Sequence, residues 1–463
     1  MRLLSHRPVS SSSSFSLRSH TVHVLLVFLF LYLLLVQYAR MRCFRDPTSL
    51  FFDPNRGYRP AYSTVRAEQA NAFIDKANSD AAAHKLPQGS HKVAEEKKLE
   101  HEKSPGLCVG VASIAREGAR YFKTTVGTVL ADLSETERAD IHLILFIAHT
   151  DPTRHPAYSE RWLHELADTV LLYDPDEVDI EHIRGLETDQ HAKVSGREKG
   201  LFDYAYLLKA CYAVNASYVV MLEDDIVALD EWYHRTRDAL RIAERQTAAM
   251  GASKWLYLRL FYTEEFLGWN IEEWPIYLFC SLIVIATLAV LLLGTRHYLL
   301  IPSTTTRRRF LTNETIFLLC GVCTPLLIAL FFAAGRVTML PIPPGVHDMP
   351  RFGCCSQGLV FPRSRVPDLL AWYESRRIGY VDMLTEEYAD LNGEIRWALT
   401  PSVLQHVGRK SSKADDYTTR PKYHLSVAER LWNFAFETND AKAARWGLFS
   451  EVLVLYIMFE LSI

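Results

Sequence analysis

The sequence has 463 residues, of which 49% are hydrophobic and 23% are charged, and its formal net charge is −3. This composition excludes an intrinsically disordered chain and a small disulfide-stabilised scaffold, and the near-neutral charge disfavours a dedicated nucleic-acid binder. The apolar residues are concentrated in a few long blocks, which is typical of a chain that crosses a membrane.

The first apolar block covers residues 21–39 and follows a short N-terminal segment, residues 1–20. In a helix, about 19 residues at about 1.5 Å each match the thickness of the bilayer core. No pair of small residues suited to signal-peptide cleavage follows the block, so it is predicted to be an uncleaved anchor with residues 1–20 as a cytosolic tail. Residues 40–104 are predicted to form a lumenal stem, because the stretch 91–103 is highly charged and poor in apolar residues.

From Leu107 onward, short apolar runs alternate with helical patterns. Strands are predicted at 107–114, 141–148, 169–173, 218–222 and 255–261. This rhythm predicts an α/β sheet whose first strands are mostly parallel. In such sheets ligands bind at the carboxyl ends of the strands.

Two further uncharged blocks, Pro275–Leu293 and Ile316–Ala334, are each long enough to span a membrane. The basic loop Arg296–Arg309 between them is predicted to be cytosolic. Residues 275–334 therefore form a membrane hairpin inserted in one domain, whose two parts are 105–274 and 335–440. Neither part alone is long enough, or complete enough, for an independent α/β core.

The apolar tail, residues 441–463, contains Glu451 and Glu460, which favours an interfacial helix but leaves a fourth membrane segment open. The neighbouring Cys354 and Cys355 are candidates for a disulfide, either with each other or with other partners. Asn215 begins an Asn-Ala-Ser sequence and is a candidate glycosylation site.

The most informative sequence is the acidic triplet Glu223-Asp224-Asp225, which follows an apolar strand. Side chains alternate along a strand, so Glu223 and Asp225 are predicted to face the same side. Hard carboxylate oxygens in this position suit Mg²⁺ or Mn²⁺, which would neutralise charge on a leaving nucleotide diphosphate. The alternative is a strand-to-loop junction with solvated acids.

The stretch 218–227 resembles the acidic motif of glycosyltransferases with the GT-A fold, including the type-four branching N-acetylglucosaminyltransferases. The sequence is more similar to the post-GPI attachment to proteins factor 4 family, whose members also have an N-terminal anchor and a membrane hairpin within the domain. Three later stretches match that family's pattern: Cys354-Cys355-Ser356-Gln357, Val381-Asp382-Met383, and Pro401–Gly408 followed by Ser411-Ser412. The resemblance covers about residues 107 to 436.

The resemblance implies a GT-A-like α/β domain interrupted by a transmembrane hairpin and preceded by a transmembrane anchor. It implies a multi-pass Golgi membrane enzyme with a lumenal catalytic domain. The expected activity is metal-dependent, inverting transfer of N-acetylgalactosamine, or a related hexose, from a UDP-sugar to the mannose core of GPI anchors, with Mn²⁺ or Mg²⁺ as cofactor.

Candidate nucleotide-sugar contacts follow from the motifs and from the strand ends: Ser113, Asp151, Glu223, Asp224, Asp225, Ser356 and Gln357. Candidate metal ligands are Asp225, Glu223 and His406, of which His406 rests on the resemblance. Asp151 is equally well explained as a turn residue before Pro152, and His406 without the family as a core or helix-end histidine.

Inverting transfer needs a carboxylate to accept the proton of the attacking hydroxyl. Asp382 is the predicted base because it matches the family's Asp-Met sequence, although an Asp here is also a candidate helix N-cap. Glu386 and Glu387 are the other candidate bases, and Glu386 is the alternative to Asp382. Both are predicted to lie on a solvated helix face, and this prediction is stronger for Glu387.

Two other functions remain open from sequence. One is a non-catalytic membrane protein that binds GPI lipids through the hairpin and carries a degenerate transferase domain. The other is a metal-dependent hydrolase acting on a lipid-linked phosphate. The sequence leaves the donated sugar, the acceptor mannose, the oligomeric state and the disulfide pairing undetermined.

Overall fold

A computed structural model describes residues 19–83, 104–116, 120–189, 193–298, 311–349, 355–409, 423 and 425–440. The chain divides into two compact units. The helical unit comprises Met1–Gly57 and Leu267–Pro341, and the sheet unit comprises Tyr58–Phe266 and Ile342–Ile463.

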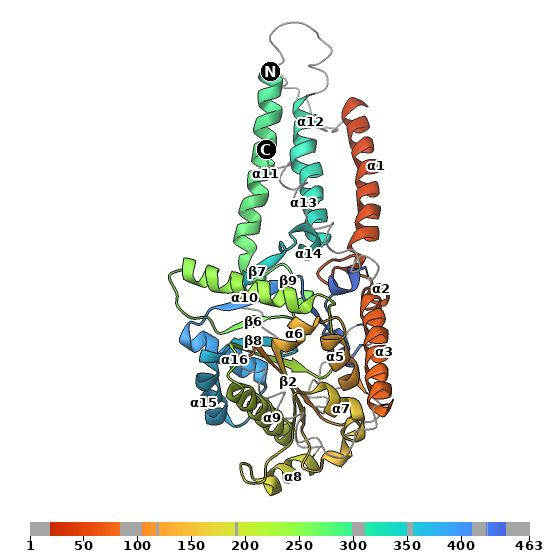
Figure 1. The fold of residues 1–463 in the computed structure, drawn as a ribbon. Coiled ribbons are helices and arrows are strands. Elements are labelled where there is room, and N and C mark those ends of the chain that lie inside the picture. The colour runs from red at the N-terminus through yellow and green to blue at the C-terminus, as the bar shows by residue number, and fades with distance from the viewer. Residues whose placement is uncertain are drawn as a thin grey trace, which may run out of the picture. The chain divides into compact units, whose positions relative to one another are not determined.

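Three long apolar helical segments form the helical unit, and each is long and apolar enough to cross a membrane (Figure 1). The first is α1 (Ser19–Arg42) and the second is α11 (Trp274–Tyr298). The third consists of α12 (Asn313–Leu318), a π-helical turn η7 (Leu319–Cys323) and α13 (Thr324–Ala333). These segments confirm the three predicted apolar spans. Short helical turns complete the unit: η1 (Cys43–Arg45), α2 (Pro54–Gly57), η5 (Ile271–Glu273) and α14 (Arg336–Met339).

The π-helical turn ends two residues before Pro325, which has no backbone N–H to donate and so disrupts the regular hydrogen bonding of the helix. The hydroxyl of Thr324 donates a hydrogen bond of 2.8 Å to the carbonyl oxygen of Leu319. A Thr side chain and a local π adjustment are the usual ways in which an apolar helix satisfies backbone groups freed by proline.

The ends of the first and third spans are joined by the buried carboxylate of Asp46. Its Oδ1 accepts from the backbone N–H of Thr48 at 2.8 Å, and its Oδ2 accepts from that of Thr338 at 2.7 Å. The Ser49 hydroxyl also donates to the carbonyl of Ala333 at 3.0 Å. The C-terminal ends of both spans therefore lie at the same end of the helical unit, as the predicted parity of three spans requires.

An eight-stranded mixed sheet forms the centre of the sheet unit, with the strand order β3-β2-β1-β4-β8-β6-β9-β7. Strands β3, β2, β1 and β4 are parallel, whereas β8 is antiparallel to both β4 and β6. The strands are β1 (Leu107–Ser113), β2 (Ile141–Ile147), β3 (Thr169–Leu171), β4 (Tyr218–Glu223), β6 (Tyr257–Arg259), β7 (Gly345–Asp348), β8 (Gly358–Pro362) and β9 (Arg396–Thr400). A separate ribbon pairs β5 (Ile226–Ala228) with β10 (Leu404–His406). The predicted α/β class, with parallel strands first, is confirmed.

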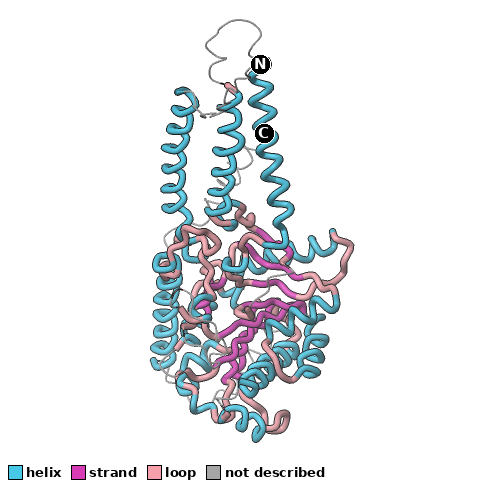
Figure 2. The backbone as a smooth tube through the Cα atoms, turned by 180° about the vertical axis from the view of Figure 1, so that it is seen from behind, coloured by secondary structure: helices cyan, strands magenta, loops and turns pink. Residues whose placement is uncertain are grey.

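Helices cover both faces of this sheet (Figures 1 and 2). One face packs against α3 (Tyr62–Ala83), α5 (Tyr121–Leu130), α7 (Arg161–Leu166) and α10 (Trp232–Ala249). The other packs against α8 (Ile180–Thr188), α9 (Lys193–Ala213), α15 (Val366–Arg376) and α16 (Val381–Asn392). Two shorter helices are α6 (Glu135–Ala139) and α17 (Val427–Arg430).

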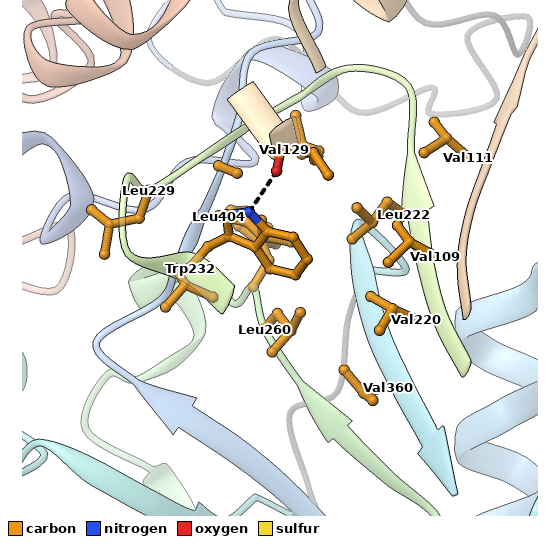
Figure 3. Close-up of a cluster of buried hydrophobic side chains, with 14 of the residues drawn as sticks. Val109, Val111, Val129, Val220, Leu222, Leu229, Trp232, Leu260, Val360 and Leu404 are labelled. Carbon is orange, nitrogen blue, oxygen red and sulfur yellow. Dashed lines mark hydrogen bonds between the residues drawn. The ribbon is translucent and has the colours of Figure 1, made fainter. Parts of the chain in front are cut away.

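Alternating strand residues build a hydrophobic core on each face. In β1, Val109 and Val111 belong to the first core and Cys108 belongs to the second. Figure 3 shows Trp232 within the first core, where its indole N–H donates to the carbonyl of Val129 at 2.9 Å. A buried tryptophan thus contributes apolar area without leaving its polar atom unsatisfied.

The predicted stem, residues 40–104, is divided between the two units. Residues 40–57 belong to the helical unit, whereas α3 packs against α5 and α7 in the sheet unit. Gly127 of α5 permits this close approach, because a Cβ there would lie 2.8 Å from the backbone oxygen of Ala70. Arg66 of α3 is buried and donates to the carbonyls of Ala228 and Thr128. The charged stretch 91–103, on which the stem prediction depended, lies outside the described residues, as do 1–18 and 441–463.

One disulfide joins Cys108 of β1 to Cys211 of α9, and the sequence did not predict this pairing. Cys355 is also disulfide-bonded, while Cys354 lies outside the described residues. Cys43 is a free, buried cysteine in the helical unit. The part of the chain predicted to be lumenal contains five cysteines, Cys43, Cys108, Cys211, Cys354 and Cys355, and an odd number requires at least one to stay free or to pair with another chain. The free Cys43 agrees with this expectation.

The shared orientation of the first and third spans can be tested by protease protection. We expect an epitope tag between Arg296 and Arg309 to be protected in sealed vesicles whose accessible face is the one carrying the sheet unit, because three spans place that loop on the opposite side. A tag after Thr438 in the same vesicles serves as the accessible control. Cleavage of both tags from the same face would contradict this membrane topology.

Candidate active site

The sheet brings four separate segments to one edge, at the carboxyl end of β4. In the parallel pair of β1 and β4, Ala112 lies opposite Glu223, so Ser113 lies beside the triplet Glu223-Asp224-Asp225. Strand β8 is antiparallel to β4 and begins opposite Leu222, which places Ser356 and Gln357 at the same edge. In the ribbon, His406 of β10 lies opposite Ile226, the residue that follows the triplet.

Asp224 is buried and holds the loop after β1. Its Oδ2 accepts hydrogen bonds from the Ser113 hydroxyl at 2.5 Å and from Nη1 of Arg116 at 2.7 Å. Burial raises the pKa of Asp224 to about 6, and the adjacent Arg116 guanidinium opposes this rise by favouring the carboxylate. The side chain therefore stays mainly ionised at neutral pH and is paired with a cation.

His155 extends this arrangement through Ser113. The backbone N–H of Ala157 donates to its Nδ1 at 3.2 Å, so Nδ1 carries no proton and Nε2 is the donor of the neutral ring. Nε2 lies 3.0 Å from the Ser113 hydroxyl oxygen, which in turn donates to Asp224. The chain of hydrogen bonds fixes the direction of the serine hydroxyl.

Asp225 and His406 form the second pair of the site, and both are buried. Oδ2 of Asp225 lies 3.5 Å from Nε2 of His406 and 3.6 Å from Nη2 of Arg116. Nδ1 of His406 donates to the carbonyl of Leu431 at 3.1 Å, which leaves Nε2 facing the carboxylate. Burial is the largest single influence and would lower the pKa of His406, but the Asp225 carboxylate, the charge of Glu223 and the hydrogen bond to Leu431 together outweigh it and the pKa is raised.

Gly408 keeps open the space that this pair faces. A Cβ at this position would lie 2.3 Å from Oδ2 of Asp225 and 2.8 Å from Nε2 of His406. A carboxylate and an imidazole whose second nitrogen donates to a backbone carbonyl are a common pair of metal ligands. Among the described residues, no group of three or more His, Cys, Asp or Glu side chains is placed to hold a metal. The residues therefore fit a cation that takes two ligands from the protein and the rest from substrate or water.

Glu223 has different partners from its two neighbours. Its Oε1 accepts from the Ser356 hydroxyl at 2.5 Å, and its Oε2 accepts from Nε2 of Gln357 at 3.2 Å. Strand β4 ends at Glu223, and Asp224 and Asp225 lie in the turn before β5. The alternation predicted for the whole triplet does not apply, because strand geometry stops at its first residue.

Asp382 lies in the first turn of α16, two residues after the N-cap position. The N-cap residue is Tyr380, so the capping alternative for Asp382 was wrong. Its Oδ2 accepts from the backbone N–H of Cys355 at 3.0 Å, and its Oδ1 accepts from that of Met383 at 2.9 Å. Asp382 thus holds the residue that directly precedes the Ser356-Gln357 pair.

The prediction of a solvated face was wrong for Glu386 and confirmed for Glu387. Glu386 forms ion pairs with the buried Arg259 at 2.7 Å and with Arg396 at 2.9 Å. Arg259 also donates to the carbonyl of Cys355 at 2.6 Å, so this charged group fixes the same loop as Asp382 does. Glu387 is exposed and pairs with Arg376.

Two other candidates lie on the surface. Asp151 is fully exposed and accepts hydrogen bonds from the backbone N–H and the hydroxyl of Thr153, which are the contacts of a turn residue. These hydrogen bonds lower its pKa. A nucleotide contact at Asp151 stays a prediction. Asn215 is exposed, as a glycosylation acceptor must be.

Sequence reasoning missed Arg116, His155 and Arg259, and it gave Gly408 no role. An isolated arginine or histidine in a loop carries no spacing signal. Arg116 comes three residues after Ser113, so the only available clue was its place at the end of the first buried strand. Gly408 was visible as part of the matched stretch Pro401–Gly408, but its closeness to Asp225 depends on the pairing of β5 with β10.

The family described as GPI-N-acetylgalactosamine transferase PGAP4 matches residues 107–405, which is more than half of the chain. The chain belongs to this family. The match begins at the first residue of β1 and ends one residue before His406. The matched range therefore contains the triplet, Ser113, Arg116 and Asp382.

Curated relatives of the chain include N-acetylglucosaminyltransferases. The chain is 28% identical over 144 residues to alpha-1,3-mannosyl-glycoprotein 4-beta-N-acetylglucosaminyltransferase B of Danio rerio, covering 27% of this chain and 24% of the relative. It is 28% identical over 174 residues to alpha-1,6-mannosyl-glycoprotein 4-beta-N-acetylglucosaminyltransferase of Gallus gallus, and this match covers 35% of this chain and 37% of the relative. The chain thus spans between about a quarter and somewhat over a third of the length of these relatives.

The histidines beside the site give a pH-dependent stability that can be measured. The backbone N–H of Ala115 donates to Nε2 of His149 at 2.8 Å, so folding requires this nitrogen to be unprotonated. Burial lowers the pKa of His149 to about 4. Below about pH 6.5 the unfolded chain binds a proton that the folded chain does not bind until about pH 4, so stability is lost as the pH falls through this window.

Thermal unfolding of the detergent-solubilised protein at about pH 7 and about pH 5.5 tests this. We expect His149→Gln, which keeps a hydrogen-bond acceptor, to reduce the acid-induced loss of unfolding free energy by at most about 1 kcal/mol. His164→Gln replaces an exposed histidine and is the matched control. An equal loss in wild type and His149→Gln would show that His149 is not held neutral.

Proposed function

We propose that this protein is a membrane-bound, metal-dependent glycosyltransferase that transfers N-acetylgalactosamine from a UDP-sugar to a mannose of the GPI glycan with inversion. The observation that carries the proposal is the division of the triplet among three sets of partners in a chain of this family. Asp224 contacts the loop after β1, Asp225 lies beside His406, and Glu223 contacts the loop before β8. A GT-A-like domain is supported by the parallel strands β3-β2-β1-β4 and by the triplet at the end of β4.

Asp224, Ser113 and Arg116 are proposed to bind the nucleoside part of the donor. Their support is their place at the carboxyl ends of β1 and β4, where ligands bind in sheets of this kind. Arg116 contacts both Asp224 and Asp225, so its guanidinium lies where the negative charge of a diphosphate would arrive. The guanidinium would attract the diphosphate and would also keep the carboxylates of Asp224 and Asp225 ionised.

Asp225 and His406 are proposed to hold the divalent cation, Mn²⁺ or Mg²⁺. When bound, this cation would neutralise the charge that develops on the departing UDP. Glu223, which was a third candidate ligand, is instead proposed to orient the transferred sugar, because Ser356 and Gln357 hold its two carboxylate oxygens. This assignment gives each acid of the triplet one role.

Asp382 is proposed as the general base. In the reaction the acceptor hydroxyl oxygen attacks the anomeric carbon, the bond from that carbon to the diphosphate oxygen breaks, and UDP leaves with the bonding electron pair. The hydroxyl proton passes to the carboxylate of Asp382. The support is the hydrogen bond from Cys355 to Asp382, which ties it to the loop that holds Glu223.

The membrane hairpin is proposed to keep the enzyme close to a lipid-linked acceptor. Strands on both sides of the hairpin in sequence pair within one sheet, for example β6 with β8 and β9. The sheet unit is therefore tied to the helical unit by three chain connections, at residues 57–58, 266–267 and 341–342. Several tethers restrict the distance from the bilayer more than one does, and this raises the effective concentration of a membrane-bound substrate. A lumenal Golgi location is part of the same proposal.

A donor screen tests the function directly. Purified protein with Mn²⁺, a panel of UDP-sugars and a GPI-glycan acceptor should give acceptor-dependent product with UDP-N-acetylgalactosamine. Asp225→Asn and a chelator should each abolish transfer, because both remove the metal. Asp176→Asn replaces an exposed aspartate and should leave the rate unchanged. Full activity in a chelator would exclude the metal from the mechanism, and phosphate or sugar release without an acceptor would favour the hydrolase.

The role of Asp382 is tested by Asp382→Asn. Asn can accept only one of the two backbone hydrogen bonds that the carboxylate accepts, and it cannot take a proton from the acceptor. We therefore expect kcat to fall by about 10²–10⁴-fold, thermal stability to fall by about the value of one hydrogen bond, and donor binding to change little. Glu387→Gln removes an exposed carboxylate from the same helix and is the matched control. Wild-type turnover by Asp382→Asn would move the base to another residue.

A further inference from the structure

Four arginines follow the first span within a short segment of the helical unit. Residues 40–57 carry four arginines and two aspartates, in a chain whose formal net charge is −3. The arginines are Arg40, Arg42, Arg45 and Arg56. Within the described part of the chain, none of these four side chains forms an ion pair with a carboxylate. A surface cluster of cations without counter-charges attracts anions from its surroundings.

Arg45 and Arg56 are held at one aromatic ring. Their guanidinium carbons lie 5.2 Å and 3.8 Å from the centroid of the Phe44 ring. The chain turns back between the two residues, and the backbone N–H of Asp53 donates to the carbonyl oxygen of Phe44 at 3.0 Å. This turn brings α2, which contains Arg56, beside η1, which contains Arg45. A cation–π contact holds a guanidinium without using its N–H groups, so both side chains keep donors for an anion.

The two acidic residues of the segment are engaged with backbone groups. Asp46 is buried, and its carboxylate accepts hydrogen bonds from two backbone N–H groups. Oδ1 of Asp53 accepts from the backbone N–H of Asn55 at 3.1 Å. The positive charges of Arg45 and Arg56 therefore repel each other, and an anion that contacts both would remove this repulsion.

General trends in membrane proteins do not explain Arg45 and Arg56. The helix dipole favours cations in the last turn of α1, which contains Arg40 and Arg42, but Arg45 and Arg56 lie beyond that helix. The predicted topology places the segment on the lumenal side, whereas arginine is enriched in cytosolic loops. A specific anion would account for two arginines that neither trend favours.

Leu50 indicates that the segment lies at the surface of the bilayer. Its side chain is 84% exposed, although its backbone N–H donates at 2.9 Å to the carbonyl of Ala333, the last residue of α13. The segment therefore lies where the first and third spans end. An exposed apolar side chain near arginines is typical of a surface that contacts lipid headgroups. This position favours a phosphate that belongs to a lipid over a soluble one.

We propose that Arg45 and Arg56 bind the phosphodiester of the lipid-linked acceptor. The inference rests on the proposed transferase function and names the part of the acceptor that the helical unit recognises. A glycosylphosphatidylinositol carries a phosphodiester between its glycan and its lipid, at the surface of the bilayer. Planar guanidinium groups donate paired hydrogen bonds to phosphate oxygens. The site raises the affinity for the acceptor and takes no part in the chemical step.

The experiment compares two acceptors, with UDP-N-acetylgalactosamine and Mn²⁺ as the other reactants. One is a GPI glycolipid in nanodiscs of phosphatidylcholine that also hold the enzyme, and the other is the same glycan without its phosphate and lipid. We expect Arg45→Gln and Arg56→Gln each to raise the KM for the glycolipid by about 3- to 10-fold, the value of a charge-assisted hydrogen bond at a partly exposed site. The kcat and the KM for the free glycan should stay at the wild-type values.

Arg59→Gln is the matched control, because it removes the same charge from an exposed arginine outside the helical unit. It should leave the KM for the glycolipid within about two-fold of wild type, and thermal unfolding should show all three variants folded. The proposal is wrong if Arg59→Gln raises this KM as much as the other variants do, or if the KM values for both acceptors rise together. It is also wrong if the effect appears only when phosphatidylglycerol is added to the nanodiscs, which would assign the arginines to anionic bilayer lipids.

Failure of the transferase function would be seen separately. If wild type transfers to neither acceptor, the function proposed above fails, and native mass spectrometry with phosphatidylinositol then decides the arginine site. This lipid carries the phosphodiester without the glycan. Binding to wild type that is weakened in Arg45→Gln and Arg56→Gln and kept in Arg59→Gln supports the site. No binding, or equal binding to all variants, overturns it.

Discussion

Three consecutive carboxylates at the end of one buried strand set the constraint on which the rest of the site depends. Two unit charges 4 Å apart repel by about 4 kcal/mol at the effective dielectric constant of a protein surface. The fold offsets this by giving each acid its own partners: Ser113 and Arg116 for Asp224, His406 for Asp225, and the β8 loop for Glu223. The strand order supplies the partners of Asp224 and Glu223, because β1 and β8 are the two neighbours of β4, and the pairing of β10 with β5 supplies His406.

The sheet is also what makes the inserted hairpin compatible with one active site. Strand β8, which follows the hairpin in sequence, pairs with β4 and β6, which precede it. Ser356, Gln357, Asp382 and His406 therefore reach the triplet only when the segment after the hairpin joins the sheet formed before it. The site therefore forms only when the strands before and after the hairpin pair with each other. The hairpin lengthens the connection between β6 and β8 in sequence but does not interrupt their pairing in the sheet.

Much of this architecture was predictable, because it depends on local patterns. Long uncharged runs predicted the three spans, and short apolar runs predicted β1, β2 and β4 to within a residue or two at each end. The triplet stood out because three acids directly after a buried run are unusual.

The residues that surround the triplet were harder to predict. The Cys108–Cys211 bond, the Asp224–Arg116 pair and the ion pair of Glu386 with the buried Arg259 depend on which helices and strands pack together, and a single sequence carries no signal for this. The predicted stem included too many residues, because the charged stretch 91–103 is not typical of the segment before it. Within that segment, α3 packs on α5 in the sheet unit.

The central claim is that the three acids have separate roles and that only Asp225, with His406, holds the cation. The most direct measurement is the affinity of Mn²⁺ in the presence of UDP, by titration of the paramagnetic ion, for wild type and for Glu223→Gln, Asp224→Asn and Asp225→Asn. The account predicts that Asp225→Asn loses most of the affinity while Glu223→Gln keeps it within about two-fold, with Asp224→Asn weakening UDP more than Mn²⁺. Equal loss of Mn²⁺ affinity in Glu223→Gln and Asp225→Asn would contradict the account.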